Sequence, residues 1–150
     1  MDQRRRTVLK SATLGMFAAL GLISETAALA AEGRVGFDAK SFADALKAIG
    51  GPGTESTDIT LTAPEIAENG AVVPLSVSSA VPNTQAIYVF VEKNPNPLSA
   101  AFTIPDGTEP SVVTRVKMGE SSRVYAVVKA DGKIYTTSRD TKVTLGGCGG

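Results

Sequence analysis

The chain has 150 residues, with 15 basic and 15 acidic side chains and therefore no formal net charge at neutral pH. It contains no histidine, no tryptophan and a single cysteine. This composition argues against zinc and haem sites, which need several His and Cys ligands, and against catalytic triads or Cys-His pairs, which need an imidazole base. It also rules out an internal disulfide.

The first thirty residues have the three-part layout of an export signal. A positive cluster is followed by an apolar, Ala-rich stretch and by a small-x-small cleavage pattern at 28–30. The run that begins with Arg5 and Arg6 and ends at Lys10 resembles the twin-arginine signal of bacteria, with an ordinary secretory signal as the alternative. We therefore expect residues 1–30 to be a cleaved twin-arginine signal peptide, which predicts a periplasmic protein with no stable membrane anchor after cleavage.

Cleavage after Ala30 would leave a chain of one domain. The remaining 120 residues are enough for one modest core, and we assign residues 31–145 to a folded domain and residues 146–150 to a terminal arm. This mature chain has 11 basic and 13 acidic residues, a net charge of −2. Because no basic stripe is present, nucleic acid is not an expected partner.

The first element of the domain is predicted to be a helix from Asp38 to Ile49. Apolar residues recur at i, i+3, i+4 and i+7, which places them on one helix face. Asp38 is the expected N-cap, and Phe37 can pack on Phe42 as a hydrophobic staple. Two glycines at 50–51, followed by a proline, end the helix.

Beyond a Gly-, Pro-, Ser- and Thr-rich break at 50–57, the pattern indicates short strands. Their apolar residues alternate with polar ones, or fill both faces as in a central strand. Pro74 predicts an edge position or a late start for its strand. The expected strands are 59–62, 71–79, 86–91, 101–104, 112–118, 124–129, 133–137 and 142–145. Several short strands separated by turn signals every 8 to 12 residues predict a mainly β chain, an antiparallel sandwich with the helix on one side or end.

Two details concern the last strands. Asp131 and Gly132 lie between two alternating segments, a strong signal for a tight hairpin. The apolar parity then changes between Ile134 and Val143. We interpret this change as a bulge or a break near residues 138–140.

The most informative segment is the end of the chain, where four glycines surround the only cysteine in the arm Gly146, Gly147, Cys148, Gly149 and Gly150. Glycine has the greatest backbone freedom of any residue, and a terminus without side chains has nothing to bury. We therefore expect a flexible arm, able to carry the thiol roughly 10 Å beyond the last strand. Its bare backbone could enter a narrow channel in another protein.

Nothing on this arm would activate the thiol of Cys148. The thiolate is the reactive form of cysteine, and no His, Lys or Arg lies within five residues. The activating group is therefore expected to come from another protein, as it would for a carrier rather than an enzyme. The carboxylates of the domain are scattered singly, apart from Glu65 and Glu68, which we interpret as part of a solvated turn. We predict no catalytic residue, no metal site and no cofactor in this chain.

Several motifs together resemble one known family, the SoxY carrier subunits of the bacterial sulfur-oxidising (Sox) system. The segments that carry the resemblance are 64–70 (PEIAENG), 94–97 (NPNP), 116–120 (VKMGE), 126–133 (AVVKADGK), 142–144 (KVT) and the terminal GGCGG. The terminal pentapeptide is the most specific of them. The match extends over the mature chain, not only its end.

The resemblance implies an immunoglobulin-like sandwich and pairing with a second β-sandwich subunit, SoxZ, in a heterodimer. It also implies that Cys148 is the site of covalent sulfur attachment. A c-type cytochrome (SoxAX) would join thiosulfate to this cysteine, a hydrolase (SoxB) would release sulfate and leave a persulfide, and a sulfur dehydrogenase (SoxCD) would oxidise the remaining sulfur. The metals and haems of the pathway belong to these transient partners.

Three other interpretations compete with this one. A ubiquitin-like sulfur carrier also ends in Gly-Gly but bears sulfur as a thiocarboxylate on its last residue, which here would be Gly150; an export signal and a β-rich body disfavour it. A structural adhesion module fits the sandwich but gives no reason for Cys148. An incidental cysteine on a frayed end is also possible, although exported proteins usually pair such residues or lack them.

Overall fold

The computed structural model describes residues 34–146 of the chain. The chain divides into two compact units, Met1–Arg34 and Val35–Gly150, and the described helix and strands all belong to the second. The predicted signal peptide and residues 147–150 lie outside the described residues. No helix within residues 34–146 is long and apolar enough to cross a membrane.

One helix and nine strands are formed in the described part of the chain. In sequence order they are α3 (Phe42–Ile49), β1 (Thr54–Glu55), β2 (Ile59–Thr62), β3 (Ile66–Ala67), β4 (Val73–Ser79), β5 (Thr84–Val91), β6 (Leu98–Thr103), β7 (Ser111–Val116), β8 (Ser122–Ala130) and β9 (Lys133–Val143). The eight strands expected from the sequence correspond to seven, because the expected strands at 133–137 and 142–145 both belong to β9. The two-residue strands β1 and β3 are additions that no periodic pattern could reveal.

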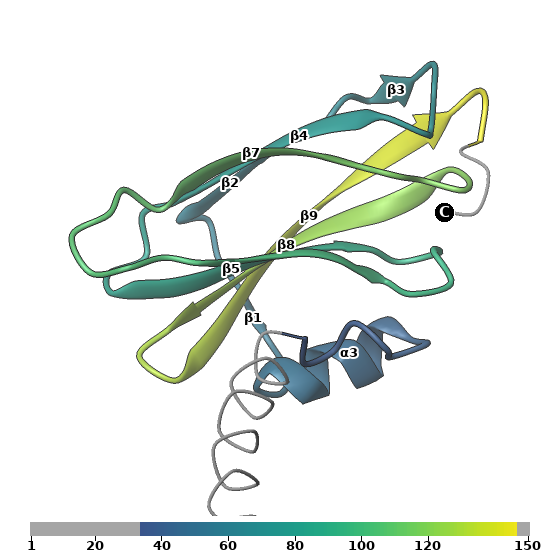
Figure 1. The fold of residues 1–150 in the computed structure, drawn as a ribbon. Helices are drawn as coiled ribbons and strands as arrows, with labels where there is room; N and C mark the ends of the chain where they lie inside the picture. The colour runs from purple at the N-terminus through teal and green to yellow at the C-terminus, as the bar shows by residue number, and fades with distance from the viewer. Residues whose placement is uncertain (1–33, 147–150) are drawn as a thin grey trace, which may run out of the picture. The chain divides into compact units, whose positions relative to one another are not determined.

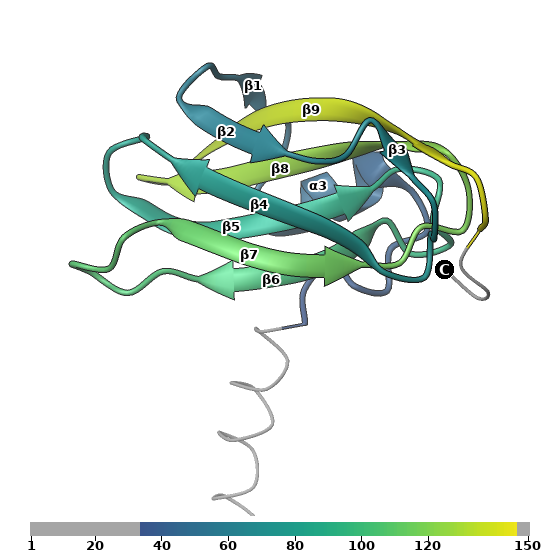
Figure 2. The same ribbon diagram turned by 90° about the horizontal axis from the view of Figure 1, so that it is seen from above.

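The strands form two sheets packed face to face, with the helix as a third layer (Figure 1). The larger sheet has the order β1-β9-β8-β5-β6, with β3 also paired to β9, and the smaller one has the order β2-β4-β7. Helix α3 covers the outer face of the larger sheet, as Figures 1 and 2 both show. Pairing is antiparallel except for β1 and β3, which run parallel to β9. The predicted immunoglobulin-like sandwich with an N-terminal helix is confirmed.

Apolar side chains gather in two clusters, one on each face of the larger sheet. The sandwich cluster lies between the sheets and includes Val73, Ile87 and Val124, each with no exposed surface. The helix cluster lies on the other face, where Ala45 of α3 packs with Val127 of β8. Strands β5 and β8 therefore bury both of their faces in their central parts, which explains the apolar runs at 86–91 and 124–128.

The predicted break in the last strand is wrong. Strand β9 pairs with β8 over residues 133–141 without any shift in register. The change in apolar parity arises because the strand contributes to both clusters: Ile134 packs in the helix cluster, whereas Tyr135 and Val143 pack in the sandwich cluster. A strand can bury Ile134 on one face and both Tyr135 and Val143 on the other without a bulge.

The helix starts later than predicted. It begins at Phe42, and its N-cap is Ser41 rather than Asp38. The Ser41 hydroxyl accepts a hydrogen bond from the Asp44 backbone N–H (3.1 Å) and donates one to the Asp44 carboxylate (2.8 Å). This reciprocal cap satisfies a free N–H of the first turn, as a capping box does. At the other end, the backbone N–H of Gly51 donates to the Leu46 carbonyl, as expected for a helix that ends in glycine.

Pro74 lies in β4, the middle strand of the smaller sheet. The sequence predicted that Pro74 would be at an edge or that its strand would start late. Strand β4 does start late, at Val73. Its neighbour β2 pairs with it only as far as Ser76, so Pro74 has a partner strand on one side alone. The residue is thus locally at an edge, where a missing N–H costs little.

The predicted hairpin between the last two strands is confirmed. Asp131 and Gly132 join β8 to β9, and both have positive φ values, 50° and 73°. Two such residues in succession make the turn that matches the twist of an antiparallel pair. The side-chain amide of Asn83, in the turn between β4 and β5, donates a hydrogen bond to the Asp131 carboxylate (3.0 Å) and supports the hairpin turn.

Candidate functional site

Strand β9 leads directly to the segment that contains Cys148, and neighbouring loops hold it over its last residues. The Thr141 hydroxyl, in a side chain that is 1% exposed, donates a hydrogen bond to the Pro64 carbonyl (2.9 Å). The Lys142 N–H donates to the Glu65 carbonyl (2.9 Å), and the parallel pairing with β3 follows. The end of β9 is therefore fixed to the segment that precedes β4.

This attachment continues past the end of the strand. The backbone N–H of Thr144 donates to the Ala67 carbonyl (3.1 Å), and its hydroxyl donates to the Glu68 carbonyl (3.1 Å). The Leu145 carbonyl then accepts a hydrogen bond from the N–H of Gly70 (2.7 Å). The chain is thus held by successive hydrogen bonds up to the residue before the predicted arm.

The opposite side of the same segment contacts the loop between β7 and β8. The Ser121 hydroxyl accepts a hydrogen bond from the Val143 N–H (2.9 Å). Gly146, the one arm residue that the structure describes, lies against the backbone of Gly119 in this loop. In Figures 1 and 2 the end of β9, strand β3 and the β7–β8 loop occupy the same end of the sandwich. We call Val143 to Gly146 with their hydrogen-bonded neighbours the arm root.

The surface around the arm root has both apolar and charged residues. Three large apolar side chains on its segments are well exposed, namely Ile66 (60%), Val72 (53%) and Leu145 (66%). The charged side chains Glu68 and Glu120 are exposed as well, which agrees with the solvated turn predicted for the first of them. An exposed charge is stabilised by water, so the arm root offers no desolvated acid or base.

Tyr88 of β5 and Arg123 of β8, both in the larger sheet, have shifted pKa values. Burial raises the pKa of Tyr88, whose side chain packs in the helix cluster. A hydrogen bond to the Asp140 carboxylate (3.1 Å) raises the pKa of Arg123, with a smaller contribution from Tyr125. Both members of this ion pair are exposed, so it contributes little to stability.

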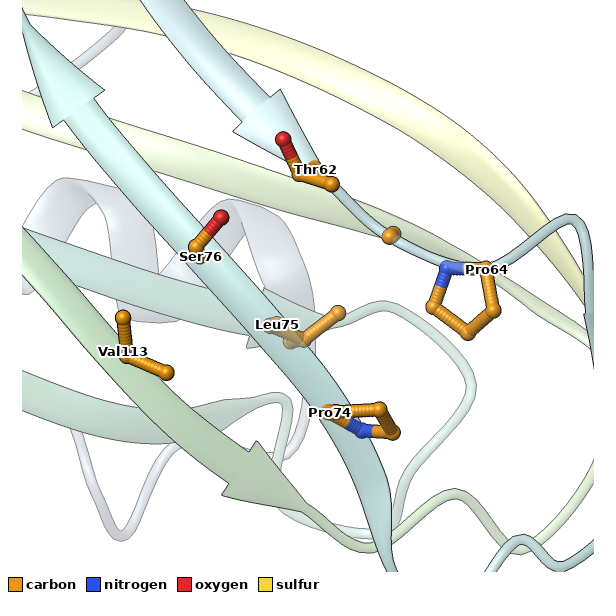
Figure 3. Close-up of a pocket in the computed structure, with 7 residues that line it drawn as sticks. Thr62, Pro64, Pro74, Leu75, Ser76 and Val113 are labelled. Atoms are coloured by element: carbon orange, nitrogen blue, oxygen red, sulfur yellow. The ribbon is translucent and has the colours of Figure 1, made fainter.

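Nothing in residues 34–146 forms a metal site, since no three His, Cys, Asp or Glu side chains gather there. The smaller sheet carries a shallow hollow of about 410 Å³ on its outer face (Figure 3). Its lining is uncharged: Thr62, Ala63, Pro64, Pro74, Leu75, Ser76 and Val113. Hydroxyl groups without a neighbouring base are not activated nucleophiles, so the residues that line this hollow do not form a catalytic site.

Of the site residues predicted from the sequence, only Gly146 lies within the described part of the chain. Cys148, Gly147, Gly149, Gly150 and the signal arginines Arg5 and Arg6 lie outside it. The residues that form the arm root were not assigned a role from the sequence. They do fall in segments that carried the family resemblance, such as 64–70, which ends at Gly70, and 116–120, which contains Gly119. A third such segment, 94–97, opens with Asn94, whose side chain accepts a hydrogen bond from the Gly119 N–H (3.2 Å). The structure brings these three distant segments together at the arm root.

The described residues form a β-sandwich domain, and in the sequence its last strand leads to a cysteine flanked by glycines. A family model described as "Sulfur oxidation protein SoxY" matches residues 46–148, a range that includes Cys148. The chain belongs to the SoxY family, and it is therefore a carrier protein of sulfur oxidation.

A solved structure agrees with this assignment. The sulfur carrier protein SoxY from Chlorobium limicola f thiosulfatophilum is 39% identical, with a TM-score of 0.64, and the match covers 71% of this chain and 95% of that one. A chain from a structure of the bacterial superantigen toxic shock syndrome toxin-1 is 13% identical, with a TM-score of 0.39, over 57% of this chain and 98% of its own. That second likeness carries no argument about fold or function. No sequence among the curated proteins matches the chain.

Proposed function

We propose that this protein is a periplasmic carrier that holds thiosulfate-derived sulfur covalently on Cys148 and presents it to the enzymes of the Sox pathway. The observation that carries the proposal is that the SoxY family match extends through residue 148, the only cysteine of the chain. The arm root supports it, because a cargo residue needs a fixed point of attachment on its carrier. The chain itself acts as a substrate subunit and not as an enzyme.

Loading is an oxidation that this protein cannot perform by itself. The Cys148 thiol and thiosulfate together lose two electrons and one proton, and a new S–S bond joins the cysteine to the sulfane sulfur. A partner c-type cytochrome of the SoxAX kind would accept the electrons. The product is a cysteine S-thiosulfonate, in which the sulfonate remains attached to the carried sulfur.

Hydrolysis by a partner of the SoxB kind would then cleave the bond between the carried sulfur and the sulfonate. Water supplies the oxygen of the released sulfate, and Cys148 keeps the carried sulfur as a persulfide. A SoxCD-type dehydrogenase could oxidise this sulfur further. The protein's own contribution is to present the cysteine without activating it, in agreement with the absence of a basic side chain within five residues of Cys148.

We also propose that the protein works as a heterodimer with a SoxZ-like subunit and reaches the periplasm through its twin-arginine signal. The signal motif around Arg5 and Arg6 supports this route. The SoxY family membership supports the partner. Export in the folded state would let both subunits travel together with one signal.

The decisive experiment replaces Cys148 with serine. The variant and the unchanged protein are incubated with thiosulfate and a SoxAX-type cytochrome, and cytochrome reduction and protein mass are followed. We expect loading to be lost, while the free energy of unfolding changes by less than about 0.5 kcal/mol, as for surface substitutions. A serine variant that still gains sulfur would refute the proposal. An adduct on the Gly150 carboxylate would instead identify a thiocarboxylate carrier.

A further inference from the structure

Gly146 occupies a position where only a residue without a side chain fits. A Cβ atom built on Gly146 would lie closer than 3.0 Å to the carbonyl oxygen of Gly119, an approach that real Cβ atoms do not make. The φ of Gly146 is not positive, so backbone conformation does not require the glycine. The glycine is required by its close approach to the backbone of Gly119. This role differs from the conformational freedom usually ascribed to glycines near a chain end.

The Gly119 loop is not free to move away from Gly146. The Asn94 side chain, which is 8% exposed, accepts a hydrogen bond from the Gly119 N–H (3.2 Å) and donates one to the Lys117 carbonyl (2.7 Å). Between these two bonds, the side chain of Met118 is fully buried. The buried amide thus fixes the loop on which Gly146 rests.

A second connection joins the same loop to the residue before Gly146. The carbonyl of Gly70 accepts a hydrogen bond from the Met118 N–H (2.7 Å), while its N–H donates to the Leu145 carbonyl (2.7 Å). Gly70 is itself buried. The β7–β8 loop, the segment before β4 and the end of β9 therefore form one hydrogen-bonded unit around the last described residues.

We propose that Gly146 is the fixed root of the carrier arm, a positioning residue that sets where the tether of Cys148 begins. The proposal rests on the carrier function of Cys148. Only Gly147 lies between Gly146 and the cysteine, so the Cα atoms of residues 146 and 148 can be at most about 7 Å apart. Because this tether is so short, its flexibility cannot compensate for a displacement of Gly146. A partner's active site must therefore come close to the arm root, and the position of Gly146 decides whether the thiol reaches it.

The test compares Gly146→Ala with two control variants in the processed protein, residues 31–150, bound to a SoxZ-type subunit. Gly53→Ala introduces crowding at another place, against a side chain instead of the backbone, because a Cβ there would also lie closer than 3.0 Å to a neighbour, the Cγ2 of Thr136 on β9. Gly147→Ala removes the same backbone freedom one residue further along the arm. Three quantities are measured: the amide hydrogen exchange of Gly70, the alkylation rate of Cys148 by iodoacetamide, and kcat and KM for loading by a SoxAX-type cytochrome.

We expect Gly146→Ala to speed exchange at Gly70 and to lower kcat about tenfold, a loss typical of a reacting group that is misplaced by less than 1 Å. KM for the carrier and the alkylation rate should change less than about twofold, because docking and thiol chemistry are untouched. Gly53→Ala should lower the melting temperature without changing kcat. Gly147→Ala should leave Gly70 exchange unchanged and reduce kcat less than about threefold.

Several results would overturn the positioning role. It fails if Gly146→Ala perturbs Gly70 exchange but keeps the original kcat, or if Gly53→Ala lowers kcat equally. It also fails if Gly146→Ala and Gly147→Ala reduce kcat equally while Gly70 exchange stays the same, since flexibility would then be the shared cause. Continued loading of Cys148→Ser would instead refute the carrier function, whereas Gly70 exchange would still report whether the root contact exists.

Discussion

Phe42 of α3 stacks on Tyr125 of β8, with their ring centroids 4.2 Å apart and an interplanar angle of 20°. The same ring meets Phe90 of β5 edge-on at 5.2 Å. This aromatic group attaches the helix to the outer face of the larger sheet. Offset-stacked and edge-to-face aromatic pairs contribute beyond the surface they bury, by about 0.5–1.5 kcal/mol each.

We expect Phe42→Ala to lower the free energy of unfolding by about 3 kcal/mol, at the low end of the range for aromatic truncations because the ring is only partly buried. Urea denaturation measures this change. Lys47→Ala, an exposed substitution on the same helix, serves as the control and should change stability by less than about 0.5 kcal/mol. Equal unfolding midpoints for the two variants would mean that the helix does not stabilise the sandwich.

The sequence predicted the architecture well because strand periodicity reflects burial directly. Alternation identified β2, β7 and β8, and the Asp131-Gly132 turn identified the final hairpin. The errors occurred where a local signal had two explanations. Asp38 and Ser41 are both acceptable caps, and only the hydrogen bonds to Asp44 distinguish them. The parity change in β9 suggested a bulge, because the sequence does not show that both faces of the sheet are covered.

The sequence offers a prediction for the chemistry of the candidate site, which stays a prediction, but none for the structure that supports it. A lone cysteine among glycines is visible in the sequence. The arm root depends on contacts between residues far apart in the chain, such as Asn94 with Gly119 and Gly70 with Leu145. No spacing rule predicts such contacts. The family motifs mark these segments without saying that they meet.

Tyr88 should make stability depend on alkaline pH. Burial raises its pKa above the ordinary value of 10.0, so the folded protein retains the phenolic proton where the unfolded chain loses it. Over that interval the unfolded state binds fewer protons, and stability must fall as the pH rises. The contribution is fully present below about pH 10 and is lost above it.

The Tyr88→Phe variant isolates this effect, since it removes the ionisable group and keeps the ring. Urea unfolding at several values between pH 8 and about pH 11 should show a shallower loss of stability for the variant than for the unchanged protein. Tyr125 and Tyr135 are retained in both and serve as the common background. If the free energy of unfolding falls equally with pH in the two proteins, Tyr88 has the same pKa in the folded and unfolded states.

Bulk on the arm should interfere with partner enzymes rather than with the thiol. Replacing Gly147 and Gly149 together with valine adds β-branched side chains on both sides of Cys148 and restricts the backbone. We expect iodoacetamide to alkylate the cysteine at nearly the original rate, while turnover with the partner enzymes falls by more than about tenfold, since a bulky arm cannot be positioned in a narrow site. Equal losses in both assays would mean that the glycines set thiol reactivity, and a threading role would be wrong.

The proposed export signal gives a prediction about the proposed partner subunit. The twin-arginine route carries folded proteins, commonly because a cofactor is inserted before export, and this chain has no histidine and a single cysteine with which to bind one. A bound partner is the remaining reason to fold first. A SoxZ-like subunit without its own signal could then leave the cytoplasm only in complex with this protein.

Replacing Arg5 and Arg6 with lysine, in cells that produce both subunits, tests this idea. Lysine keeps the positive charge that an ordinary secretory signal requires but removes the twin-arginine pair. We expect both subunits to remain in the cytoplasmic fraction. Arg4→Lys, which leaves the pair intact, is the matched control and should allow export of both. If the partner still reaches the periplasm while this chain is retained, the two do not travel together, and if the double variant is exported normally, the signal is an ordinary secretory one.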